Sequence, residues 1–126
     1  MAQAYVQVTT TTDERAEAGE LASAAVAERL AACAQVVGPI SSTYWWEGEI
    51  ETAEEYMVVF KTTAERYPQL AQLIADRHSY ETPEIIATGI AGSADYLAWV
   101  AEQTADEDDD EDALESADED DLEIVE

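Results

Sequence analysis

The residues with the clearest capacity for chemistry lie in one stretch, HSYETPEI, at positions 78–85. It contains the only histidine of the chain, His78, followed closely by Glu81 and Glu84. A single imidazole beside carboxylates suits a borderline divalent ion such as Cu²⁺ or Zn²⁺. The stretch therefore predicts that His78, Glu81 and Glu84 bind a divalent metal, and that the binding is weak because one histidine is a small donor set.

Two other interpretations of the same residues stay open. The stretch can be a structural corner between a helix and a strand, in which His78 closes the helix and Tyr80 packs its ring and hydrogen-bonds its hydroxyl. Alternatively, Glu81 or Glu84 acts as a general base near His78 in an enzyme. The sequence has no Ser–His–acid order, no Gly-rich phosphate loop and no second histidine, so we expect no enzymatic activity.

Cys33, the only cysteine, offers a different kind of donor. A thiolate favours Cu(I) or Zn²⁺, but a lone cysteine is more simply a small buried hydrophobic residue. One cysteine excludes a disulfide within the chain, and no leader or membrane-length apolar run is present. We expect a soluble cytoplasmic protein without a membrane partner.

Hydrophobic periodicity predicts the elements that must position these residues. Helix starts are indicated by a capping box of Thr11 with Glu14, by Thr62 or Thr63, and by a cap at Ser93. The predicted elements are a strand at 5–10, a helix, a strand at 34–46, a strand ending at 61, a second helix, a strand at 84–91 and a short final helix.

The second and third predicted strands form a long hairpin. Gly38-Pro39 interrupts the second strand, which predicts a bulge because proline cannot donate to a ladder. Residues 47–49 turn the chain back, and the segment TYWWEGEIE at 43–51 forms the tip.

The order β-α-β-β-α-β is that of an α+β, ferredoxin-like split βαβ fold, here with an added C-terminal helix. This topology gives an antiparallel sheet ordered 4-1-3-2 with two helices on one face. Chain direction then gathers the candidate residues Thr10, Asp13, His78, Glu81 and Glu84 at one end of the sheet. Cys33 is expected at the opposite end, away from His78.

The charge of the chain divides it into two parts. Residues 105–126 hold fourteen of the thirty acids and none of the five bases, and the net charge is −25. Ordering this tail would cost about 1–2 kcal/mol per residue with few apolar side chains to offset it. We therefore predict a domain at 1–104 and a disordered acidic tail at 105–126. So few bases exclude nucleic acid as a partner.

The second face of the predicted sheet needs a cover. A compact part of about 100 residues has no further element to supply it, so another copy of the chain is the simplest cover, with the hairpin as the arm that reaches across. The sequence thus predicts a homo-oligomer.

Five blocks of the sequence closely resemble the CutA family of divalent-cation tolerance proteins. They are AERLAACAQVV at 27–37, TYWWEGEIE at 43–51, VVFKTT at 58–63, HSYETPEIIA at 78–87 and DYLAWV at 95–100. The resemblance implies a ferredoxin-like subunit in a homotrimer, with a role in tolerance to copper and other divalent metals and no enzymatic activity. Because the trimer is similar in plan to PII signalling proteins, an alternative is a signalling trimer that binds a small metabolite at subunit clefts through Arg15, Lys61 and Arg77.

The resemblance also bears on the copper ligands. In bacterial members with a copper assignment, the ligands are a cysteine at the end of the first strand and two adjacent histidines. The matching positions here are Thr10, Arg77 and His78, so one ligand of three is kept. Arginine cannot ligate a metal, and the resemblance therefore implies weak, carboxylate-assisted binding.

Overall fold

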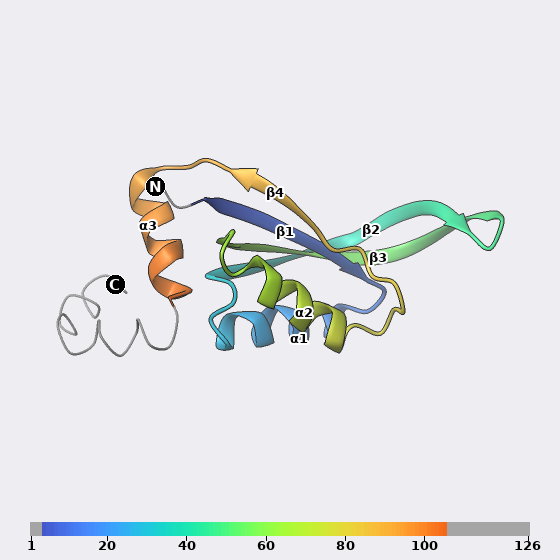
Figure 1. Ribbon diagram of the computed structural model, residues 1–126. Coiled ribbons are helices and arrows are strands. Elements are labelled where there is room, and N and C mark those ends of the chain that lie inside the picture. Colours follow the sequence, from blue (N-terminus) through green and yellow to red (C-terminus); the bar gives the residue numbers. More distant parts are fainter. Residues whose placement is uncertain (1–3, 106–126) are drawn as a thin grey trace.

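The computed structural model describes residues 4–105, which form four strands and three helices (Figure 1). The elements are β1 (Tyr5–Thr12), α1 (Arg15–Ala27), β2 (Cys33–Trp46), β3 (Glu49–Thr63), α2 (Tyr67–Arg77), β4 (Ile86–Ile90) and α3 (Ala94–Gln103). None of the helices in this range is long and apolar enough to cross a membrane. The predicted tail at 105–126 lies outside the described residues except for Ala105.

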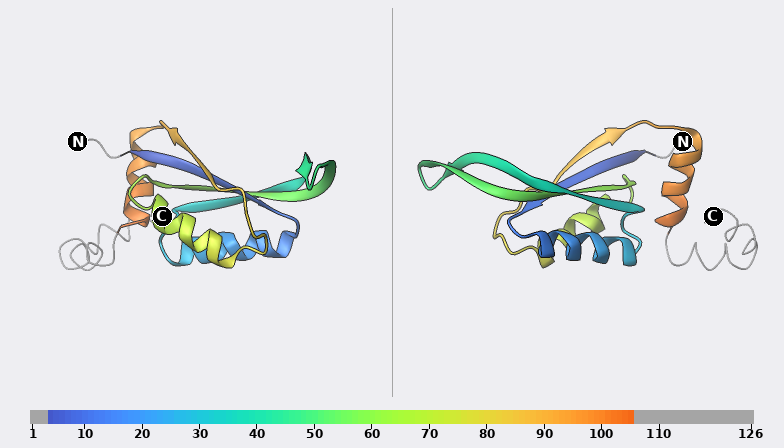
Figure 2. Two further views of the ribbon diagram at one scale, coloured as in Figure 1. Left: turned by 45° about the vertical axis from the view of Figure 1, so that its right-hand side comes forward. Right: turned by 180° about the vertical axis from the view of Figure 1, so that it is seen from behind.

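The strands form one antiparallel sheet in the order β2-β3-β1-β4, which confirms the predicted ferredoxin-like topology. Both α1 and α2 lie on the same face of this sheet, and they run antiparallel to each other (Figures 1 and 2). The end of β1 and the end of α2 therefore meet at one end of the molecule, as the topology predicts.

The core lies between the sheet and these two helices. Val8 of β1 stands opposite Phe60 of β3, and both side chains are fully buried. Ala18 and Ala25 are buried on α1, where small side chains let the helix approach the sheet closely. Leu70 and Ile74 bury the facing side of α2. Further buried members of this cluster are Leu21, Leu30, Ala31, Val58 and Leu73.

The opposite face of the sheet is covered by neither α1 nor α2 (Figure 2). Because side chains alternate along a strand, the neighbours of Val8 and Phe60 point to this open face. They include Thr9 and Val59, which are half-buried, and Ile86, which is 55% exposed. A single chain therefore leaves apolar side chains of β3 and of the edge strand β4 accessible to water on this face.

The β2–β3 hairpin extends well beyond the rest of the sheet and forms an arm (Figure 1). The register slips between Val37 and Ile40, so the bulge predicted at Gly38-Pro39 is confirmed. At the tip, Glu47 and Gly48 both have positive φ, as a two-residue type I′ turn requires. The tip exposes Trp45 to 71% and Trp46 to 59%.

Two predicted helix starts are wrong. Thr11 does not cap α1, because β1 continues through Thr12 in register with β3, and Glu14 is the residue before the helix. Thr62 and Thr63 likewise end β3, and α2 begins at Tyr67, although the Thr63 hydroxyl does accept a hydrogen bond from the backbone N–H of Arg66 in the turn that leads into the helix. In both places a β-branched residue that suits a cap also suits a strand, and the ladder hydrogen bonds decide.

The third helix begins as predicted. The side chain of Ser93 accepts a hydrogen bond from the backbone N–H of Tyr96, which caps α3. This helix stands at the far end of the sheet from the β1–α2 corner (Figure 1). Its Tyr96 hydroxyl lies 3.4 Å from the sulfur of Cys33, and this contact, with burial, raises the pKa of Tyr96 to about 12.

We predict that Gly38→Ala destabilises the fold. A Cβ at this position would lie 2.6 Å from the Tyr56 ring and 3.1 Å from the Glu55 carbonyl oxygen. Overpacking of this kind costs about 1–3 kcal/mol. The control is Gly19→Ala in α1, where nothing lies within 4 Å and the exchange should stabilise by about 0.5–1 kcal/mol. Chemical unfolding measures both, and equal effects would contradict the packing argument.

Candidate functional site

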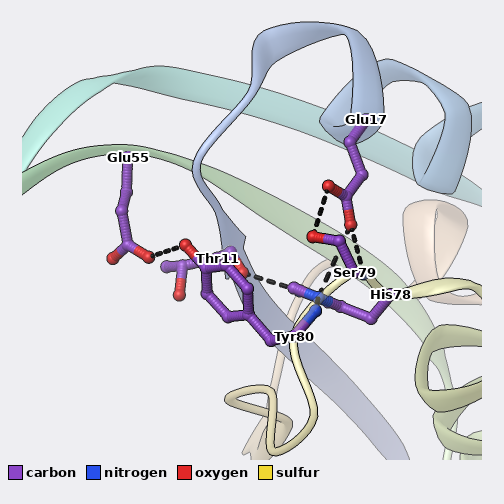
Figure 3. A network of polar contacts seen from close by, with 6 residues as sticks. All are labelled: Thr11, Glu17, Glu55, His78, Ser79 and Tyr80. Atoms are coloured by element: carbon purple, nitrogen blue, oxygen red, sulfur yellow. Dashed lines mark hydrogen bonds and ion pairs between the residues drawn. The ribbon is translucent and has the colours of Figure 1, made fainter. Parts of the chain in front are cut away.

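The stretch at 78–85 forms a polar corner around a buried imidazole (Figure 3). The His78 side chain is 0% exposed. Its Nε2 lies 2.7 Å from the carbonyl oxygen of Thr11, and its Nδ1 accepts a hydrogen bond from the backbone N–H of Tyr80 at 3.0 Å. Since a carbonyl only accepts, Nε2 carries the proton and the neutral ring has both nitrogens satisfied. His78 thereby joins the end of α2 to the end of β1.

Tyr80 connects the corner to β3. Its hydroxyl donates to Oε2 of Glu55 at 2.7 Å, and Glu55 is buried on β3. Burial, this hydrogen bond and the carboxylate charge raise the pKa of Tyr80 well above its usual range. The hydroxyl therefore stays protonated and serves as a donor. The predicted interpretation of Tyr80, a packed ring with a bonded hydroxyl, is confirmed; its ring also packs at 4.7 Å from that of His78.

Glu17 of α1 closes the corner from the other side. Its carboxylate accepts hydrogen bonds from the backbone N–H and the hydroxyl of Ser79, both at 2.8 Å, and lies 3.5 Å from Nδ1 of His78. Burial works to raise the pKa of Glu17, but the bonds from Ser79, with contributions from Thr12 and His78, outweigh it and the pKa is lowered. This contribution to stability is present above the ordinary glutamate pKa and is lost as pH falls through the lowered value.

The other predicted residues are placed less favourably for ligation. Thr10 is buried on the helix-covered face, pointing into the core. Glu81 and Glu84 are exposed, and within residues 4–105 no hydrogen bond or ion pair joins either of them to His78. Asp13 is also exposed, although its charge acts on Tyr80. The candidate residues share one end of the sheet without converging on one point.

The geometry does not supply a preformed metal site at His78. A metal would have to displace either the Thr11 carbonyl or the Tyr80 amide from a ring that water does not reach. Across the described part of the chain, no three His, Cys, Asp or Glu side chains are grouped so that they could hold an ion. A closed site would need such a group. Metal binding by His78, Glu81 and Glu84 stays a prediction. The two hydrogen bonds at the His78 ring limit the affinity that such binding can reach.

The cations that the metabolite-binding alternative requires do not face one another within a chain. Lys61 donates to Gln35, and both point to the open sheet face. Arg77 lies on the helix side, where it approaches Glu28 at 3.4 Å. Arg15 is exposed at the start of α1.

Two residues of the corner, Glu17 and Glu55, are not among the residues that the sequence predicts. Glu17 had a detectable signal, because a carboxylate in the first turn of α1 must lie at the end where α2 finishes. Glu55 had no local signal. It sits among the exposed-looking residues of the arm, and only the register of β3 against β1 brings it to Tyr80.

Comparisons with known proteins agree on one family. The family model for the CutA1 divalent ion tolerance protein matches residues 6–103. A protein of Escherichia coli O139:H28, "Divalent-cation tolerance protein CutA", is 37% identical over 98 residues, which cover 77% of this chain and 88% of that protein. Among solved structures, the Thermus thermophilus protein "Divalent cation tolerance protein (Cut A1)" is 37% identical, with a TM-score of 0.78 over 80% of this chain and 99% of its own. The structure of "CutA1 from Oryza sativa" is 33% identical, with a TM-score of 0.79 over 82% and 95%.

The Tyr80–Glu55 pair generates a prediction about stability. Tyr80→Phe should lower the free energy of unfolding by about 1.5–3 kcal/mol, because a buried carboxylate loses its donor. Combining it with Glu55→Gln should cost less than the sum of the two single changes. Since the pKa of Tyr80 is raised in the folded state, its contribution is complete below about pH 10 and is lost as pH rises further.

Denaturant unfolding of the four proteins, repeated at rising pH, measures both effects. Strict additivity of the two changes would contradict a direct bond. A gap between the unmodified chain and Tyr80→Phe that widens in alkali would contradict the sign of the pKa shift.

Proposed function

The chain belongs to the CutA1 divalent ion tolerance family, and from this membership we propose that it acts in tolerance to divalent metal ions, copper among them, as a non-enzymatic homotrimer. The relatives named as divalent-cation tolerance proteins support the metal role. We also propose that the protein is cytoplasmic, in line with a single free cysteine at Cys33.

The apolar surface that one chain leaves exposed is the main support for the proposed assembly. The open sheet face and the arm tip with Trp45, Trp46 and Ile50 are both without cover within a chain. Tryptophan at a protruding tip is typical of an interface anchor. In a closed cyclic assembly each arm lies on a neighbour's open face, which covers both surfaces at once.

For the metal itself, we take direct binding at His78, Glu81 and Glu84 to be weak. The metal must compete with two hydrogen bonds of 2.7 and 3.0 Å that the His78 ring already makes. Proton and metal both require a ring nitrogen, and so acid should weaken the binding further. Tolerance then depends on more than sequestration at this corner.

The assembly has a direct test. Light scattering at moderate to high salt should give three times the subunit mass of 13.8 kDa. The double variant Trp45→Ser/Trp46→Ser should assemble more weakly, so that it is already dissociated at concentrations where the unmodified trimer stays intact. Each lost tryptophan should reduce the free energy of association by about 2 kcal/mol or more. Val26→Ser, an exposed apolar residue of α1 on the helix side, is the matched control. A monomer mass for the unmodified chain would exclude the trimer.

Metal binding is tested by titrating Cu²⁺ into the protein at neutral pH. We expect weak binding that falls by about tenfold or more in His78→Ala and is nearly unchanged in Cys33→Ala, because Cys33 lies at the other end of the sheet. Tight binding that Cys33→Ala abolishes would place the metal elsewhere and contradict the proposal.

A further inference from the structure

A groove on the helix side collects most of the positive charge of the chain. Arg29, Arg66 and Arg77 line it, and they are three of only five basic residues in a protein of net charge −25. Its volume is about 690 Å³, and its acidic lining residues are Glu28 and Asp76. We call it the arginine groove. Such a concentration of guanidinium groups on a strongly acidic chain indicates a surface for an anion.

Two of these arginines also hold the end of the described chain. Arg29 donates through Nη1 to the carbonyl oxygen of Gln103 at 3.0 Å. Arg66 donates through Nε to the carbonyl oxygen of Thr104 at 2.7 Å. These carbonyls belong to the last turn of α3 and the residue after it, and Ala105 itself lines the groove. The exit of the remaining chain is therefore fixed at the rim of the groove.

The residues that follow this exit are the most acidic of the sequence. Positions 106–112 read DEDDDED, and positions 106–126 contain fourteen acids and no base. Seven extended residues span up to about 23 Å, which is enough to cross a groove of this volume. Because the segment is tethered at the rim, its effective concentration there is of millimolar order. A free anion in solution has no such advantage.

We propose that the arginine groove is the docking surface for the chain's own acidic segment, with residues 106–112 against Arg29, Arg66 and Arg77. Guanidinium groups pair well with carboxylates and leave room for many arrangements. The segment therefore need not adopt one backbone conformation and avoids most of the ordering cost. The contact is electrostatic, so it weakens as salt shortens the screening length from about 10 Å at 0.1 M.

The test uses the full chain with a nitroxide on residue 116, in the variant Cys33→Ser/Ser116→Cys. At low salt the backbone amide NMR signals of Leu30, Gln72 and Arg77 should lose most of their intensity, while those of β4 stay sharp. High salt should restore them. Arg77→Gln should also restore much of the intensity, and Arg15→Gln, the same charge change at an exposed residue that does not line the groove, should not.

A second measurement avoids the cysteine exchange. In the unmodified chain, the side-chain Nε–H signal of Arg77 should shift as salt is raised. With the acids of 106–112 replaced by their amides, the shift should become much smaller, and what remains comes from the pair of Arg77 with Glu28 at 3.4 Å. An unchanged shift in that variant would overturn the proposal.

Three other results would overturn it as well. Groove signals that the nitroxide leaves sharp, while inorganic phosphate shifts them, would make the groove a small-anion site. Broadening equal in Arg77→Gln and Arg15→Gln would mean no preference for the groove. In a mixed sample, the nitroxide can be placed on one chain and the isotope label on another. Broadening that persists in this sample would show that the segment binds the groove of a neighbouring copy.

Discussion

One buried imidazole determines how the chain is closed at one end of the molecule. The His78 ring, with one nitrogen donating to Thr11 and the other accepting from Tyr80, ties the end of α2 to the end of β1. A buried polar group is stable only when its hydrogen bonds are made, so the ring dictates the path of the chain that follows. That path sends Tyr80 to Glu55 on β3 and Ser79 to Glu17 on α1. Four elements thus meet at residues 78–80.

The same corner explains why the arm and the open face remain for other tasks. With the helices, the corner and α3 occupied in holding one chain together, no described element covers the second face of the sheet (Figure 2). The apolar surface of that face and the tryptophans of the arm are what a neighbouring copy would contact. On the helix side the arginine groove stands apart from both, beside the start of the acidic segment. The surface proposed for assembly and the arginine groove therefore lie on opposite sides of the sheet.

The sequence predicts the fold well, because alternation, helical periodicity and Ser93 each carry a local signal. Its errors lie where one residue type serves two structures. Thr11 and Thr62 suit a cap and a strand equally, and only the pairing of β1 with β3 decides between them. The residues of the corner also differ in whether a local pattern predicts them. The bonded hydroxyl of Tyr80 follows from its burial, whereas Glu55 as its partner depends on a register between strands that no local pattern reveals.

We take His78 to be first a structural residue, which a metal could reach only at the expense of its hydrogen bonds. Nitrogen NMR of the imidazole ring, recorded during a titration with diamagnetic Zn²⁺ at neutral pH, distinguishes a structural ring from a metal ligand. We predict that at equimolar metal Nε2 keeps its proton and Nδ1 its acceptor signature, with changes only at large excess. A His78 nitrogen that shows the signature of bound metal at equimolar Zn²⁺ would contradict the claim.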